Sequence, residues 1–167
     1  MMSILRTTLT LAVLLAVLVG AMIWGYRQVT KPFPQVVDPP ICEVVEIDAG
    51  TKVRPREVVV NVLNAGTRSG LAARTMGLLT EEGFVEGVSG NASRETKVPE
   101  SVTWTSDRTD PAARLVRSYF RGRIIERPNL DPGITVVVGN RFDSLENGRR
   151  TVAARVDTET CRATTPD

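Results

Sequence analysis

Between residues 57 and 156 the chain alternates between β-branched runs and segments with helical spacing. The run 57–63 is rich in valine and has the pattern of a buried strand. The run 134–138 is similarly β-branched and unbroken, which indicates a central strand covered on both faces. Weaker strand patterns occupy residues 84–88, 102–105 (with Val102 and Trp104 on one face), 124–125 and 151–156, and residues 91–100 are predicted to form a polar loop.

Two segments carry the signals of helices. In the first, Ser69 is predicted as the N-cap and Gly83 as the stop. In the second, Asp110 is predicted as the N-cap, Pro111 as the first helical residue and Gly122 as the end. The element order β-α-β-β-α-β-β predicts an α/β domain in which two helices pack on a mixed sheet of four to five strands.

An apolar block without a charge covers residues 7–26. A helix of this length crosses the hydrocarbon core of a bilayer, so we predict a transmembrane helix at 7–26 and a cytoplasmic tail at 1–6. A cleaved signal peptide is the alternative, because Val19, Gly20 and Ala21 form a passable small-residue cleavage site. The apolar run continues beyond that site, which favours an uncleaved anchor.

Two cysteines, Cys42 and Cys161, bracket most of the remaining chain. Their position suits one disulfide joining the ends of a domain at 42–161, and two unpaired buried thiols are the alternative. Stable disulfides need an oxidising compartment, so we expect this domain to be extracytoplasmic. A proline-rich linker at 27–41 is predicted before it, and a disordered polar tail at 162–167 after it.

Composition narrows the possible chemistry. The net charge of +2, with both signs interspersed, lacks the strongly basic balance of a nucleic-acid-binding protein. The chain has no histidine, which removes the commonest general base and the commonest metal ligand. We therefore predict no catalytic residues, no cofactor and no metal, although scattered Asp and Glu residues leave a glycosidase-like carboxylate pair open.

A glycine-bearing turn joins the strand at 57–63 to the first helix. Three residues separate Gly66 from Gly70, and Leu71 follows, so the spacing fits neither a Walker-type loop nor a dinucleotide fingerprint. The free N–H groups of the turn, helped by Arg68, are a candidate for weak anion binding. The alternative is that both glycines permit tight turn dihedrals and close packing.

Arginines form a second candidate surface. Arg114, Arg117 and Arg121 recur at i, i+3 and i+7 of the second predicted helix. Such a stripe suits anionic lipid headgroups or wall polymers. A solvated helix face is the alternative interpretation.

The stretch VVVNVLNAGTRSGLAARTMGLLTEEGF resembles the start of the LytR C-terminal domain family, which has a strand, an Asn-rich turn, and Gly-Leu-Ala leading a helix that ends in Gly-Phe. The turn that carries this resemblance contains Asn61, Asn64, Gly66 and Gly70. VTWTSDRTDPAARLV and ITVVVGNRFDSL are similar to later parts of the same family. The resemblance covers residues 57–145 and leaves the two cysteines outside.

The resemblance implies a cell-envelope setting. The family's domain occurs alone behind a membrane anchor, especially in actinobacteria, or after the LytR-CpsA-Psr catalytic domain that attaches polymers to peptidoglycan. This chain has no room for that catalytic domain, so we expect a non-enzymatic module of the stand-alone type that binds such transferases or wall polymers. Direct peptidoglycan binding is the alternative, and a hydrolase or transferase is a third.

Overall fold

The computed structural model describes residues 2–29, 41–128 and 131–164, in two units divided after Pro39. The first unit contains one helix, α1 (Met2–Val29). The helix covers the whole apolar block and extends beyond it on both sides, because no proline interrupts these residues. Within the described part of the chain, no helix is both long enough and apolar enough to span a membrane. Residues 30–40, most of the predicted linker, lie outside the described residues.

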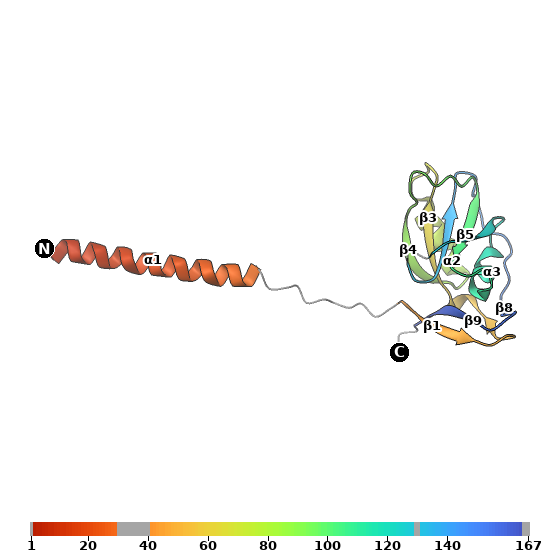
Figure 1. Ribbon diagram of the computed structural model, residues 1–167. Helices are drawn as coiled ribbons and strands as arrows, with labels where there is room; N and C mark the ends of the chain where they lie inside the picture. Colours follow the sequence, from red (N-terminus) through yellow and green to blue (C-terminus); the bar gives the residue numbers. More distant parts are fainter. Residues whose placement is uncertain (1, 30–40, 129–130, 165–167) are drawn as a thin grey trace. The chain divides into compact units, whose positions relative to one another are not determined.

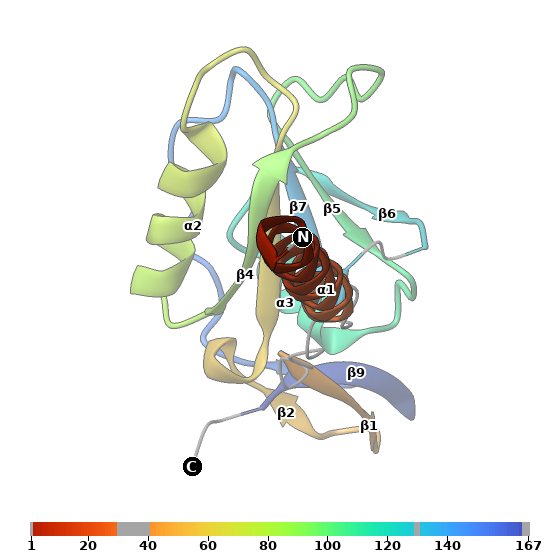
Figure 2. The same cartoon turned by 90° about the vertical axis from the view of Figure 1, so that its left-hand side faces the viewer.

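The second unit is built around a five-stranded sheet, whose strands are labelled in Figures 1 and 2. In order across the sheet they are β4 (Val85–Asn91), β3 (Val59–Asn64), β7 (Ile134–Val138), β5 (Ser101–Thr105) and β6 (Arg123–Glu126). β3 runs parallel to β4 and β7, and β5 runs parallel to β6 but antiparallel to β7. The predicted mixed sheet is confirmed, with β7 in its centre. β4 also extends to Asn91, into the segment predicted as a loop.

Two helices pack on one face of this sheet, α2 (Leu71–Glu81) and α3 (Pro111–Arg117). Their buried side chains share one apolar cluster with Val60 of β3 and Val136 of β7. Side chains alternate between the two faces of a strand, so Asn61 and Thr135 point to the opposite face. The helices therefore cover one face only, and the other face is left to the loops.

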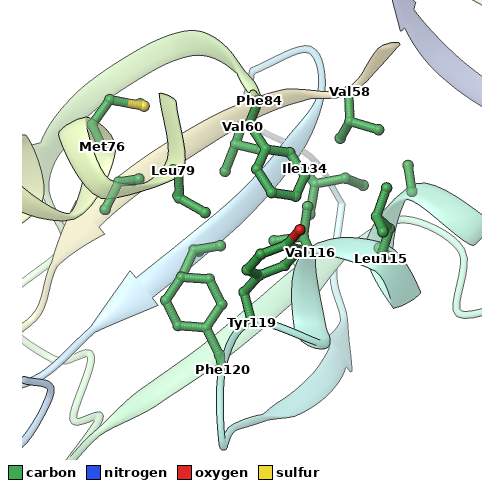
Figure 3. Packing of buried hydrophobic residues seen from close by; sticks show 14 of the residues in the cluster. Val58, Val60, Met76, Leu79, Phe84, Leu115, Val116, Tyr119, Phe120 and Ile134 are labelled. Atoms are coloured by element: carbon green, nitrogen blue, oxygen red, sulfur yellow. The ribbon is translucent and has the colours of Figure 1, made fainter. Parts of the chain in front are cut away.

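Aromatic rings fill the space between the helices and the sheet (Figure 3). The rings of Phe84 and Tyr119 meet edge to face, with centroids 5.1 Å apart. Phe120 packs against Phe142 with centroids 5.5 Å apart. Such aromatic pairs contribute about 0.5–1.5 kcal/mol beyond the area they bury. The first pair holds the segment after α3 against the start of β4, and the second holds it against the loop after β7.

The start of α2 differs from the prediction, whereas its end agrees. Gly70, with a left-handed φ of 73°, is the N-cap in place of Ser69, and no side chain caps the helix. A residue with this backbone conformation has to be glycine in most cases, so the tight turn decides where the helix begins. At the other end Gly83 has a φ of 90°, and the Phe84 N–H donates to the Leu79 carbonyl at 3.1 Å, as in a Schellman motif.

α3 starts as predicted but ends early. Asp110 accepts the N–H of the residue two positions on at 2.8 Å, and proline occupies the first helical position. The helix stops at Arg117 instead of near Gly122. Tyr119 and Phe120 are consecutive and both buried, whereas a regular helix directs neighbours about 100° apart. The chain turns through i→i+3 hydrogen bonds at this point, which brings both rings into the core.

Two short ribbons close the lower end of the unit in Figure 2. β1 (Cys42–Ile47) pairs with β9 (Thr158–Ala163), and β2 (Lys52–Val53), which precedes the 3-10 turn η1 (Pro55–Glu57), pairs with β8 (Val152–Ala153). The edge strand predicted at 151–156 is thus a two-residue strand outside the main sheet. The tail predicted as disordered from residue 162 is also wrong at its start, because Arg162 pairs with Glu43 within β9 and β1; residues 165–167 lie outside the described residues.

The predicted disulfide is present between Cys42 and Cys161, with Cα atoms 5.5 Å apart and a sequence separation of 119. Cys42 lies opposite Ala163 and Cys161 lies opposite Val44, so the two cysteines are diagonal neighbours across the β1–β9 ribbon. The bond joins the two ends of the folded unit. A covalent loop of this size removes much of the conformational freedom of the unfolded chain.

We expect a Cys42→Ser/Cys161→Ser double variant to lose about 4–5 kcal/mol of unfolding free energy, the value of the chain-entropy model for a loop this long. Urea unfolding followed by circular dichroism, with and without a reductant, measures the loss. The reductant should lower the midpoint of the parent protein and leave the variant unchanged. Equal midpoints for parent and variant would contradict a stabilising role of the bond.

Asp110 links α3 to the β1–β9 ribbon as well as capping the helix. Its carboxylate accepts a hydrogen bond from the Thr160 hydroxyl at 3.0 Å, and the residue is 7% exposed. Burial raises the pKa of Asp110 from 3.8 to about 6, against the opposing effect of the hydrogen bonds from Ala112 and Thr160. The charged carboxylate is therefore disfavoured in the folded protein.

This raised pKa predicts a pH dependence of stability. Between about pH 4 and pH 6 the folded state binds more protons at Asp110 than the unfolded state, so the unfolding free energy falls as pH rises, by about 3 kcal/mol. Asp110→Asn keeps an N-cap side chain and should remove this component. Urea unfolding at intervals from pH 4 to pH 7 compares the two proteins, with the exposed Asp143→Asn as control. Identical slopes in the parent and Asp110→Asn would refute the assignment.

Candidate functional site

The sheet face opposite the helices carries a pocket of about 370 Å³, called here the sheet pocket. Its floor comes from three neighbouring strands through Asn61, Leu63, Thr135 and Trp104. One wall comes from the end of β4 and the residues after it, between Asn91 and Thr96, and the other comes from Arg127, Pro128 and Asp131. The volume lies within the range of about 300–1,000 Å³ that is usual for small-molecule sites.

Trp104 and Arg127 separate the sheet pocket from a second hollow. The guanidinium carbon of Arg127 lies 4.5 Å from the centroid of the indole ring, a cation–π contact. Both residues also line the outer hollow, which measures about 610 Å³ and contains Lys97 and Arg123. The two hollows thus meet along one stacked pair of side chains.

The hydrogen bonds of Asn61 hold the pocket in shape. Its buried side-chain amide donates to the Pro132 carbonyl at 2.9 Å and accepts the Val88 N–H at 2.8 Å. One residue of β3 thereby fixes the wall at residues 131–132 and the irregular pairing of β4. Asn91 and Asp131, which line the same pocket, make no side-chain hydrogen bond or ion pair with other described residues. Their polar atoms are available to a ligand.

The predicted anion-binding turn uses its polar groups internally. Asn64 donates through its side chain to the Arg68 carbonyl and accepts the Gly66 N–H, both at 2.8 Å. The Arg68 guanidinium donates to the carbonyls of Phe142 at 2.8 Å and Asn140 at 3.2 Å. These contacts join the turn to the loop after β7. Arg68 thus has a structural role, and anion binding at this turn stays a prediction.

The three predicted surface arginines do not form one helical stripe. Arg114 and Arg117 lie on α3, but Arg121 follows the end of the helix. Arg114 donates to the Ala153 carbonyl and Arg117 to the Gly122 carbonyl, each at 3.2 Å. Arg121 forms an ion pair with Glu146 at 2.6 Å. Arg114 thus contacts β8, and the other two guanidinium groups contact neighbouring loops. Binding of the three arginines to an external anion or partner stays a prediction.

The sequence pattern did not identify Trp104 and Arg127 as site residues. Alternation along β5 places Trp104 and Thr103 on opposite faces, and the structure buries Thr103 completely beneath the helices. The face with Val102 and Trp104 is the loop-covered face. The signal that could have identified this face is a tryptophan in a strand whose other face carries only hydroxyl side chains.

The family comparison agrees with this geometry. A family model described as "LytR cell envelope-related transcriptional attenuator" matches residues 57–142, a segment that contains the whole main sheet and both of its helices. The chain belongs to this family. The resemblance predicted from the turn and helix motifs is therefore confirmed, and membership gives the chain a cell-envelope-related setting.

A solved structure is also similar. The soluble domain of a conserved hypothetical secreted protein from Mycobacterium marinum has a TM-score of 0.49 and 21% sequence identity, over 64% of this chain and 77% of that chain. None of the curated proteins matches this chain significantly. The role of the sheet pocket therefore has to be argued from its own chemistry.

The turn geometry gives a prediction at Gly66. An added Cβ there would overlap the Asn140 side-chain oxygen and approach the Asn140 backbone nitrogen at 3.0 Å. We expect Gly66→Ala to lower the unfolding free energy by about 1–3 kcal/mol through overpacking. Gly77→Ala, inside α2 with nothing within 4 Å of the new methyl group, is the matched control and should stabilise by up to about 1 kcal/mol. Equal thermal stability of Gly66→Ala and the parent would contradict close packing at the turn.

Proposed function

We propose that this chain is a non-enzymatic, extracytoplasmic module, anchored in the membrane by its N-terminal segment, that supports cell-envelope assembly by binding an envelope component. The disulfide that closes the ends of a cell-envelope-family domain carries the proposal. Stable disulfides persist in oxidising compartments and are rare in the cytosol. The family description names the cell envelope, and this agrees with the proposed setting.

The anchor in this proposal rests on the charge-free sequence of residues 7–26. Leu14, Leu18 and Trp24 of α1 are exposed. Continuous apolar surface of this kind is unfavourable in water, and a lipid bilayer would cover it. A single pass with residues 1–6 in the cytoplasm would leave the domain outside.

A binding role is supported by the groups that line the two hollows. These groups combine apolar surface with hydroxyl, amide and charged side chains, a mixture typical of ligand-binding sites. The chain has no histidine, and the described residues contain no cluster of acidic or cysteine side chains suited to a metal ion.

The partner class follows from the shape of the site. A concave pocket with an aromatic residue and a few polar groups suits a small ligand or a segment of polymer, which favours a wall polymer over a LytR-CpsA-Psr-type transferase. Direct peptidoglycan binding is one form of this function. Capture of a transferase by crosslinking in cells would favour the other form.

The location is tested in cells that make the full chain. We expect the C-terminus to be cleaved by protease added outside spheroplasts, and Cys42 and Cys161 to resist alkylation until a reductant is added. The chain should stay in the membrane pellet at alkaline pH. Leu14→Arg/Leu18→Arg should release it, because charges in the apolar segment oppose insertion. Reduced cysteines together with a protected C-terminus would overturn the proposal.

A further inference from the structure

We infer that the sheet pocket and the outer hollow together bind a linear saccharide chain, laid across Trp104 and Arg127. This inference rests on the proposed binding function and names its ligand class. The site is assembled from β3, β5, β6 and β7, from residues between Asn91 and Pro99, and from Arg127, Pro128 and Asp131.

On the floor of the sheet pocket, side chains and not the edge of a strand have to recognise the ligand. The floor of the sheet pocket lies on β3, β7 and β5, and each of these strands is hydrogen-bonded to neighbours on both sides. A peptide that binds by strand addition needs a free sheet edge, and this floor has none. The ligand must therefore suit a set of side-chain groups above a closed backbone.

These side chains combine apolar surface with both kinds of hydrogen-bonding group. Leu63, Trp104 and Pro128 supply apolar surface. Asp131 only accepts hydrogen bonds when ionised, Arg127 only donates, and the Asn91 amide does both. A sugar ring has the matching character, because its C–H groups form apolar patches and its hydroxyls both donate and accept.

Other ligand classes fit less well. An acyl chain in the sheet pocket would bury Asp131 and Asn91 without partners, and desolvation of unpaired polar groups is costly. In the sheet pocket, a phosphate or lipid headgroup would meet the Asp131 carboxylate, whose charge repels it. Arg127, the cation that lines the sheet pocket, is already stacked on Trp104.

The connection between the hollows indicates a chain of sugars rather than one ring. Both hollows are lined by Trp104, Arg127, Ser93 and Thr96. The Ser93 and Thr96 hydroxyls lie 2.9 Å apart and hydrogen-bond to each other. A linear oligosaccharide would place one ring in each hollow with the linkage over the stacked pair, so a tetramer should bind more tightly than its monomer.

Trp104 is also the natural reporter of binding. The chain contains two tryptophans, and the other, Trp24, lies in α1. In a Trp24→Phe background, the full chain in a detergent without sugar headgroups reports on Trp104 alone. The probes are the tetramers of N-acetylglucosamine and of glucose, each compared with its monomer.

We expect at least one tetramer to shift the Trp104 emission saturably, with half-saturation at about 1 mM. Its monomer should bind about tenfold more weakly. Asn91→Ala and Asp131→Asn should each weaken tetramer binding about tenfold, the loss expected for one ligand hydrogen bond. Both side chains are exposed, so the variants should fold normally. Arg74→Ala, on the exposed face of α2 in the other layer, is the control and should bind like the parent.

No saturable shift with either tetramer up to about 10 mM would overturn the inference. Binding that both pocket variants leave unchanged would also overturn it, as would tighter binding of an extended peptide than of any sugar. None of these outcomes changes the expected results of the protease cleavage and cysteine alkylation experiments, which test the location of the domain. A failed ligand assignment is therefore distinguishable from a failed location.

Discussion

The hydrogen bonding of β7 on both of its sides is the constraint on which the domain depends. Each half of the main sheet is a strand-helix-strand unit, β3-α2-β4 and β5-α3-β6. β7 comes later in the chain and joins them, parallel to β3 and antiparallel to β5. Val136 faces the helices and Thr135 faces the sheet pocket. One strand therefore supports both the core and the proposed site.

The sequence predicted those elements whose own residues carry a clear pattern, such as a β-branched run or a helix cap. β3 and β7 are β-branched and buried on both faces, and Asp110 with Pro111 marks the start of α3. The ends of elements depended on tertiary contacts that no local pattern contains. α3 stops early because Tyr119 and Phe120 both enter the core. β1 and β9 were missed because each finds its partner at the opposite end of the domain.

The candidate site was harder to predict than the fold. Alternation put Trp104 and Val102 on the same face of β5, but it does not tell which face the helices cover. Arg127 reaches the indole from a loop after β6, and Asn91 lies at the end of β4. The predicted polar residues Asn64 and Arg68 instead stabilise the turn before α2. A sequence pattern does not show that such polar side chains already bind backbone carbonyls of the same protein, and these side chains are then not free to bind a ligand.

The disulfide has a mechanical consequence for the proposed arrangement, in which the domain is attached to the membrane and binds an envelope component. Tension from a membrane attachment enters the folded unit at β1, just before Cys42. Antiparallel ribbons such as β1–β9 unzip one hydrogen bond at a time when pulled from an end. The bond between Cys42 and Cys161 diverts that tension into β9 through a covalent link before unzipping begins. In the setting proposed above, a pull on the N-terminal side of the domain would therefore not separate β1 from β9.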